Sequence, residues 1–433
     1  MSTGSGIDRR RFMQLAGLSG AAALAGCKQS ESGGGGDART LKIGYVSPKT
    51  GPLAGFAEAD DFILNGVRTA LKDGLAIGGT TYPVDLLVRD SQSDPNRAAT
   101  VATDLINGDQ VDLMLVASTP ETTNPVADQC EANGVPCISS VAPWQPWFFG
   151  RQGDPEKPFQ WTYHFFWGLE DIIAVFTDMW GQVDNNKVVA ALWPNDGDGN
   201  AWGDKKTGFP PALTKEGYKI VDPGRYQNGT EDFSSQIAKF KAADAEIVTG
   251  VPIPPDWTTF WKQASQQGFQ PKIASVGKAL LFPASVEALG DIGDGMSTEV
   301  WWSPAHPFKS SLTGESAAQV AGQYEAATGR QWTQPIGFVH ALFEVAAAAL
   351  KATANVDDKQ ALANAIKGVD LDTVVGKISW SGGPVPNVAK TPLVGGQWRK
   401  SDGERYPFKL VIVSNKDHPE IPKTGSLAPI PYN

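Results

Sequence analysis

The sequence predicts an α/β protein with two lobes, each with helices on both faces of a parallel sheet. Short apolar runs alternate with helical segments over most of the 433 residues, as they do in sheets with helical crossovers. The alternation stops in an aromatic segment at 144–167 and then starts again, which indicates a second lobe of the same kind. The length leaves room for two separate cores.

The first series of elements precedes the aromatic segment. Apolar runs bounded by turn residues predict buried strands at 41–46, 82–89, 111–116 and 137–139. Helices are expected at 57–74 and 95–107, and a third is expected to begin with Asn124 as N-cap and Pro125 at its first position. Gly134 and Pro136 would end that helix.

The second series and the tail follow the same reasoning. Strands are expected at 187–193, 218–223, 246–251 and 272–275, and helices at 172–180, 233–243, 257–267 and 284–289. The chain would return to the first lobe at 299–302, with helices at 316–327, 336–353 and 358–367. The tail predicts strands at 378–380, around Trp398 and at 408–413.

The first residues have the layout of an export signal. Three arginines and Phe12 precede an apolar segment at 13–25, which is too short to span a bilayer. The arginines resemble a bacterial Tat signal, and the LAGC that ends at Cys27 resembles a lipobox, in which the Cys is lipidated. We expect residues 1–26 to be removed and residues 27–39 to be a flexible linker. The protein would then be lipid-anchored outside the cytoplasmic membrane, in the periplasm or its equivalent.

The charge excludes some partners. The formal charge is -10, and removal of residues 1–26, with three Arg and one Asp, makes it -12. This balance argues against nucleic acid or an anionic membrane surface as a partner. Cys130 and Cys137 could form a disulfide in an oxidising compartment, or they could be two buried thiols.

No pattern in the sequence supports catalysis or a metal. Asp196 to Asn200 has the opening spacing of an EF-hand, but Ala201 and Thr207 replace its required Gly and Glu. The four histidines are scattered, and the nucleotide and nucleophile-elbow motifs are absent. We interpret His340 and Glu344, one turn apart on an apolar helix, as a satisfied core pair. We therefore expect a protein without enzymatic activity and without a cofactor.

The stretch from Val111 to Ser140 is the first candidate for a binding site. Its predicted βαβ unit places a hydroxyl-rich loop at the carboxyl end of a strand and the amino end of a helix. Free backbone N–H groups and the helix dipole make such a place suitable for an anion, and doubly wound sheets bind ligands there. An ordinary connection with capping residues is the alternative.

Three passages of the sequence are similar to those of a known family. The chain resembles the type I periplasmic solute-binding proteins of ABC transporters, in the leucine/isoleucine/valine-, amide- and urea-binding branch. The resemblance covers about residues 40–415. It is carried by LKIGYVSPKTGPLAGFA at 41–57, LMLVASTPETTNPVADQCEANGVPCIS at 113–139, and GKISWSG at 376–382 with LVGGQW at 393–398.

The resemblance implies two Rossmann-like lobes joined by three crossovers, which close on a small solute by a hinge motion. The crossovers are expected near 164–168, 298–303 and 376–380. Lobe 1 would then comprise 40–165 and 302–377, lobe 2 would comprise 166–301 and 378–415, and 416–433 would be a tail. The implied partners are a small solute and ABC permease subunits, with the protein itself a monomer that touches the membrane only through its anchor.

The family's site residues carry over to both lobes. In lobe 1 the resemblance implies that an amino-acid carboxylate would meet residues after the third and fourth strands, namely Ser118, Thr119, Thr122 or Thr123, and then Ser140, Val141 and Ala142. Phe56 matches an aromatic that lies over the ligand, and Trp202 matches a frequent Tyr. Pro252–Trp257 and Ser275–Lys278 match the two remaining second-lobe loops, from which Pro252 and Lys278 are candidate contacts.

One departure suggests the solute. Amino-acid binders often supply an acid for the ammonium where this chain has Lys278, which would repel an ammonium and attract a carboxylate. Trp144, Trp147 and Trp202 suggest a flat solute. We therefore hypothesise a carboxylate-bearing, aromatic or amino-acid-like solute rather than a branched-chain amino acid. Alternatively, Lys278 points to solvent and the Trp side chains pack in the core. A sensor of the same fold or a tethered secreted enzyme are the rival functions.

Overall fold

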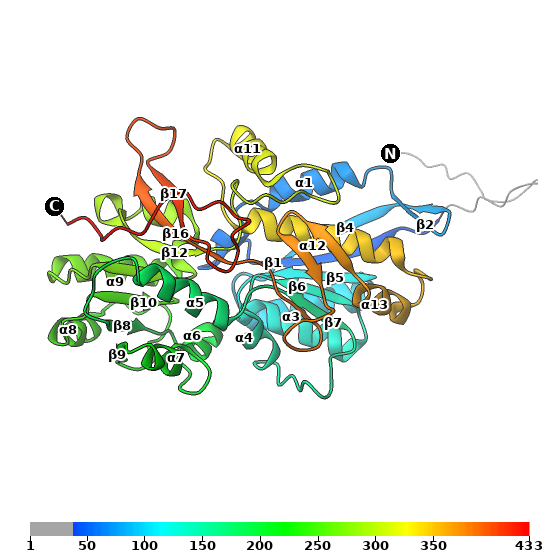
Figure 1. Cartoon of the computed structure of the whole chain (residues 1–433). Helices are drawn as coiled ribbons and strands as arrows, with labels where there is room; N and C mark the ends of the chain where they lie inside the picture. Colours follow the sequence, from blue (N-terminus) through cyan, green and yellow to red (C-terminus); the bar gives the residue numbers. More distant parts are fainter. Residues whose placement is uncertain (1–37, 433) are drawn as a thin grey trace, which may run out of the picture. The chain divides into compact units, whose positions relative to one another are not determined.

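The computed structural model describes residues 38–432, whose framework consists of two large sheets (Figure 1). The predicted leader and Cys27 lie outside the described residues. The first sheet is parallel throughout, with the order β15-β7-β6-β5-β1-β4. Its strands are β1 (Leu41–Ser47), β4 (Val84–Asp90), β5 (Leu113–Ala117), β6 (Cys137–Ser140), β7 (Thr162–Phe165) and β15 (Val388–Ala389).

The second sheet has the order β17-β16-β12-β11-β10-β8-β9. It is parallel except where β16 pairs with β12 and β17. Its strands are β8 (Val188–Leu192), β9 (Lys219–Val221), β10 (Ile247–Gly250), β11 (Ile273–Val276), β12 (Ser297–Val300), β16 (Val394–Lys400) and β17 (Phe408–Ser414). Two small hairpins are formed by β2 (Leu75–Ile77) with β3 (Thr80–Tyr82), and by β13 (Asp370–Thr373) with β14 (Gly376–Ser379).

Helices flank both sheets, and the predicted two-lobed α/β architecture is confirmed (Figure 1). The helices of the first lobe are α1 (Asp60–Ala70), α2 (Pro95–Thr103), α3 (Pro120–Asn133), α4 (Trp144–Phe148), α11 (Ala317–Thr328), α12 (Pro335–Ala352) and α13 (Lys359–Lys367). Those of the second lobe are α5 (Leu169–Trp180), α6 (Gly197–Trp202), α7 (Phe209–Lys215), α8 (Ser234–Ala242), α9 (Pro254–Gln266) and α10 (Pro283–Glu287). Short 3-10 turns are η1 (Ala54–Ala57), η3 (Ala279–Leu281) and η4 (Gly290–Gly293), and η2 (Asp104–Gly108) extends α2.

The chain passes between the sheets three times. The first passage follows β7 and the second follows β12, close to the expected positions. The third differs from the expectation, because β15 still pairs with β7 and the chain reaches the second sheet only at β16. The segment expected to cross, β14, instead forms a hairpin with β13. A strand pattern in sequence does not say which strand will be its partner, and that is why the expected position was wrong.

Both chain ends of the described part are held by specific contacts. Arg39, at the end of the predicted linker, forms ion pairs with Asp112 and Asp357 at 2.9 and 2.6 Å. The predicted tail packs on the second lobe, where the Ile430 N–H donates to the Lys272 carbonyl and the Tyr432 hydroxyl donates to the Pro271 carbonyl.

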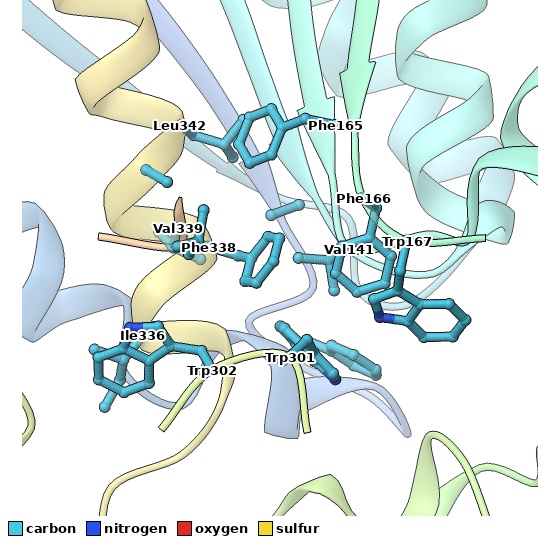
Figure 2. Packing of buried hydrophobic residues seen from close by; sticks show 14 of the residues in the cluster. Val141, Phe165, Phe166, Trp167, Trp301, Trp302, Ile336, Phe338, Val339 and Leu342 are labelled. Atoms are coloured by element: carbon cyan, nitrogen blue, oxygen red, sulfur yellow. The ribbon is translucent and has the colours of Figure 1, made fainter. Parts of the chain in front are cut away.

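Helix α12 is the central core element of the first lobe. Among residues 38–432 it is the one helix long and apolar enough to cross a membrane, but most of its residues are buried in the core. Figure 2 shows Ile336, Phe338 and Leu342 of α12 among aromatic side chains that include Trp302. The Trp302 indole donates to the Val374 carbonyl at 3.2 Å. This helix is therefore packed between elements far apart in sequence.

The polar groups of α12 find partners, as predicted. The His340 ring is hydrogen-bonded to the Ser310 hydroxyl at 2.8 Å, and the Glu344 carboxylate accepts from Ser311 and from the Val374 N–H. Burial lowers the pKa of His340 to about 4 and raises the pKa of Glu344 to about 7. Their environment is that of a satisfied core pair.

The two cysteines are buried, adjacent and unbridged. Cys130 lies on α3 and Cys137 begins β6, and both are free thiols. Burial and the hydrogen bond to Cys137 raise the pKa of the Cys130 thiol, so this thiol is a poor nucleophile.

Two helical glycines give opposite predictions for stability. A Cβ at Gly337 would lie 2.3 Å from the Trp302 ring, whereas a Cβ at the exposed Gly322 of α11 would meet nothing within 4 Å. Gly337→Ala should lower the free energy of unfolding by about 1–3 kcal/mol through overpacking. Gly322→Ala should raise it by about 0.5–1 kcal/mol through helix propensity. Urea unfolding of both variants measures the difference, and equal effects would contradict the packing described for α12.

Candidate functional site

A small cavity lies between the lobes, at the carboxyl ends of strands from both sheets. It is lined by residues that follow β1, β5, β6 and β7 in the first lobe and β8, β10 and β11 in the second, and by residues at the end of β12. These are Phe56, Thr119, Val141, Pro143, Phe166, Trp167, Asp198, Trp202, Val251, Lys278, Leu281, Glu299 and Trp301. The volume is about 20 Å³, which is room for about one water molecule. The two walls must therefore move apart before they can enclose a solute.

The amino end of α3 forms part of the first-lobe wall. Thr119 is its N-cap and Pro120 its first residue, so the helix begins one turn before the predicted Asn124–Pro125 start. Thr-Pro and Asn-Pro are both suitable starts, and the earlier one extends the helix to the end of the strand loop. Pro125 lies inside the helix.

Three hydroxyl groups at this helix end have no hydrogen-bond partner in the described part of the chain. They belong to Ser118, Thr119 and Thr122, and all three side chains are buried. The Thr119 side chain does not cap the helix, although it lines the cavity. Thr123 differs, because its hydroxyl donates to the Ser118 carbonyl at 2.9 Å. The helix end thus keeps unpaired donors beside the cavity.

The loop after β6 contributes backbone more than hydroxyl groups. The Ser140 hydroxyl donates to the Phe165 carbonyl at 2.6 Å, and the Ala142 carbonyl is bonded to the His164 ring at 2.7 Å. Val141 lines the cavity with φ of 75°, a conformation that is costly for a β-branched residue. Ser140 and Ala142 are therefore occupied by structural bonds, and Val141 and Pro143 are the residues of this loop that line the cavity.

Lys278 lies in the second-lobe wall, but its charge is already paired. Its ammonium lies 2.7 Å from Asp198 Oδ2 and 3.2 Å from Asp196 Oδ2, and the side chain is 4 % exposed. Burial acts to lower the pKa of Lys278, but the carboxylates of Asp196 and Asp198 outweigh it and raise that pKa. The expectation of a free positive charge is therefore wrong, and so is the alternative that Lys278 points to solvent.

Acidic groups outnumber this lysine on the second-lobe wall. Asp198 and Glu299 both line the cavity, and burial raises the pKa of each, that of Glu299 to about 7. Asp198 Oδ1 has no hydrogen-bond partner among the described residues. Glu299 accepts from the Lys278 N–H at 3.1 Å and from the Thr298 hydroxyl at 2.8 Å. This wall therefore offers acceptors, in contrast to the donors at the end of α3.

Aromatic rings complete the cavity. Figure 2 shows Phe166, Trp167 and Trp301 near Val141. The Phe166 ring centroid is 4.9 Å from that of Trp167 and 5.1 Å from that of Trp301. Trp202 is fully buried in the second lobe and stacks on Phe209 at 4.9 Å. The indole nitrogens of Trp167, Trp202 and Trp301 have no partner among residues 38–432.

Some predicted residues lie elsewhere. Trp144 lines a different cavity and its indole donates to Glu170 at 3.1 Å. Trp147 is a core residue stacked on His164 at 4.7 Å. Pro252 does not line the interlobe cavity, although its neighbour Val251 does.

The sequence reasoning missed several lining residues. They are Pro143, Phe166, Trp167, Asp198, Val251, Leu281, Glu299 and Trp301. Asp198 belongs to the calcium-like loop at 196–200, where no complete motif predicts a place in the cavity. Glu299 and Trp301 lie at a predicted crossover, where proximity to the cleft was a usable signal. Residues 38–432 hold no group of three metal-ligating side chains.

Two contacts join the lobes beside the cavity. The Gly197 N–H of the second lobe donates to Glu121 Oε1 of the first at 2.7 Å. On the other side, the rings of Phe56 and Phe282 meet edge to face with centroids 5.0 Å apart. The polar contact at α3 and α6 and the apolar contact at η1 thus hold the two walls together.

Comparison with known proteins agrees with this two-walled arrangement. The sequence model of a family described as "Periplasmic binding protein" matches residues 40–403. The chain belongs to the periplasmic binding protein family. This family consists of binding proteins rather than enzymes and works outside the cytoplasmic membrane.

Three relatives of this periplasmic binding protein illustrate the likeness. A Leu/Ile/Val-binding protein homologue of Brucella melitensis is 24 % identical, over 79 % of this chain and 87 % of its own length. A leucine-binding protein from Thermotoga maritima superposes with a TM-score of 0.69 at 18 % identity, covering 87 % of this chain and 99 % of that one. An ABC-transporter solute-binding protein from Rhodopseudomonas palustris, solved with 3,4-dihydroxybenzoic acid, gives 0.68 at 19 % identity, covering 86 % and 96 %.

Removal of the Glu121 side chain tests the polar contact between the lobes. Glu121→Ala should favour a more open arrangement, because the Gly197 N–H loses its acceptor. Small-angle X-ray scattering should then give a larger radius of gyration than for the wild type. Glu121→Gln is the control, since its amide oxygen can still accept. An unchanged radius for Glu121→Ala would show that the bond does not restrain the lobes.

The buried acid Glu299 gives a prediction for pH. The ordinary pKa of a Glu carboxyl is 4.5, and burial raises the pKa of Glu299 in the native state to about 7. Between these two pH values the native state keeps the Glu299 proton, whereas the unfolded chain releases it. The proton therefore stabilises the fold at low pH, and this contribution is lost as the pH rises through 7. Relative to wild type, the near-isosteric Glu299→Gln should gain up to about 3 kcal/mol of stability between pH 5 and pH 8. Urea unfolding at both values measures it.

The exposed Glu156→Gln is the control for loss of a carboxylate. Parallel pH profiles for wild type and Glu299→Gln would contradict the burial of an acid in this wall.

Proposed function

We propose that the protein is the solute-binding component of an ABC importer and captures a small carboxylate with a flat or aromatic apolar body. The two lobes close on the solute by a hinge motion and present it to permease subunits. The supporting observation is the Thr119 hydroxyl, which is buried, unpartnered and lines the cavity at the uncapped end of α3. Such a helix end favours an anionic group.

The rest of the cavity suits the remainder of such a solute. Rings from both lobes surround the space where its body would lie, which favours an aromatic or branched group. The unpartnered Asp198 oxygen would accept from a hydroxyl or ammonium at the other end. Because Lys278 is paired with two aspartates, it gives no reason to exclude an ammonium. Hydroxylated aromatic acids and aromatic amino acids are therefore both members of the proposed class.

The relatives agree with this class without fixing the solute. The Rhodopseudomonas palustris protein was solved with an aromatic acid, and the Brucella melitensis protein is named for branched-chain amino acids. Both kinds of solute have a carboxylate and an apolar body. The leader suggests attachment through a lipid at Cys27 after export by the Tat route.

A ligand panel tests the proposal on the purified mature protein. Mass spectrometry of small molecules that co-purify with it should find a carboxylate. Calorimetry should then show binding of 4-hydroxybenzoate or phenylalanine in preference to leucine, and loss of binding when the carboxylate becomes an alcohol. Tight binding of leucine without binding of aromatic acids would contradict the aromatic body. Equal binding of acid and alcohol would contradict the carboxylate.

A single substitution tests the α3 end. Thr119→Val keeps the shape and removes the hydroxyl, so affinity for the carboxylate solute should fall about tenfold or more, as for a lost hydrogen bond to a charged group. Thr100→Val on the exposed face of α2 is the control, because its hydroxyl bonds only to its own helix. Equal affinity of the two variants would place the carboxylate elsewhere.

A further inference from the structure

A second cavity lies beside the interlobe cavity and shares none of its lining residues. It is bounded by α3, α4 and the start of α5 on one side and by α6 and the loop after it on the other. We call it the side pocket. Its volume is about 710 Å³, within the range of roughly 300–1,000 Å³ that small-molecule sites occupy. Unlike the interlobe cavity, it can take a ligand without any movement of the lobes.

The apolar wall of the side pocket is aromatic and partly exposed. The rings of Trp144 and Phe149 lie 5.7 Å apart, and Pro146 lies between them in sequence. Phe149 is 51 % exposed, and among residues 38–432 it shares such exposure of a large apolar side chain only with Tyr432. An exposed ring at the edge of a cavity is a ready contact for a flat ligand.

Two acceptors in the first turns of α3 lack a regular hydrogen-bond partner. Asn124 donates its amide N–H to the Pro146 carbonyl at 3.0 Å, which fixes its orientation and leaves Oδ1 buried without a partner. Pro125 has no N–H, so the Glu121 carbonyl four residues earlier lacks its regular helical hydrogen bond. Asn124 and Glu121 both line the pocket.

The charges of the side pocket have one sign. Its charged lining residues are Glu121 and Asp204, and no Lys or Arg of residues 38–432 lines it. The Asp204 carboxylate accepts a hydrogen bond from the Thr207 N–H at 2.8 Å, so one of its two oxygens already has a partner. Acceptors, negative charge and an aromatic wall together select against an anion and favour a cation.

We propose that the side pocket is a second binding site, for a small organic cation that joins a primary ammonium to a flat apolar body. The ammonium would donate to the Glu121 carbonyl and pair with the carboxylates of Glu121 and Asp204, and the body would lie against Phe149 and Trp144. A primary ammonium fits because it has three N–H donors. Since both lobes line the pocket, its occupant would bind the closed arrangement. The proposal is independent of the carboxylate solute of the interlobe cavity.

Titration of the full mature chain with 2-phenylethylammonium alone tests the site. By calorimetry the amine should bind at least about tenfold more tightly than its neutral isostere 2-phenylethanol. Phe149→Ala should weaken binding of the amine about tenfold through loss of the ring contact. Tyr432→Ala, which removes the other exposed aromatic ring, should leave it unchanged.

Pro125→Ala supplies a second, independent variant. Its restored N–H should pair with the Glu121 carbonyl and remove one acceptor from the pocket, so affinity for the amine should fall severalfold. The helix should not be weakened, because Ala is favoured where Pro interrupts the hydrogen bonds. The proposal would be overturned if the amine and the alcohol bound equally well, or if millimolar amine gave no heat. It would also be overturned if Phe149→Ala and Pro125→Ala both kept the wild-type affinity.

Discussion

The second lobe's wall of the cleft depends on one buried ammonium. Lys278 is 4 % exposed, and a charge so far from water needs partners of opposite charge. Asp196 and Asp198 supply them, and because both belong to the start of α6, they tie the loop after β8 to the loop after β11. The backbone of Lys278 has φ of 60° and lies in a tight turn in which the Ala279 N–H donates to the Gly277 carbonyl at 2.6 Å. That conformation costs free energy, and the two ion pairs offset it.

This ion cluster also decides the polarity of the cleft. Because the charge of Lys278 is paired with aspartates, the second-lobe wall presents carboxylate oxygens to the cleft. The first-lobe wall presents the uncapped end of α3 and its hydroxyls. Each buried polar atom left without a partner costs about 1–3 kcal/mol. Both walls of the cleft hold such atoms, so a solute with an anionic end and a donor end would recover free energy on both sides. Under the proposed function, the solute would therefore add to the contacts that already hold the walls together.

The fold could be predicted from sequence because its strands are short apolar runs separated by clear breaks, and strand β5 and helix α12 show how directly burial follows from that pattern. The third crossover could not be predicted, since the pairing of β15 with β7 is decided by contacts over more than 200 residues. The lining of the interlobe cavity was predicted in part. Phe56, Thr119, Val141, Trp202 and Lys278 do line the cavity. The partners of Lys278 were hidden, because Asp196 and Asp198 are some 80 residues away and appeared to belong to a failed metal motif.

Glycine residues set how closely the lobes approach. A Cβ at Gly55 would lie 3.2 Å from the Phe282 ring, and one at Gly197 would lie 3.0 Å from Glu121 Oε1, so these two contacts between the lobes each have a glycine beside them. Larger side chains there would keep the walls apart and enlarge the cavity of about 20 Å³. The side pocket is bounded by the same α3–α6 contact, since Glu121 and Gly197 line it while Thr119 and Asp198 line the interlobe cavity. The hydrogen bond from Gly197 to Glu121 therefore lies between the two spaces.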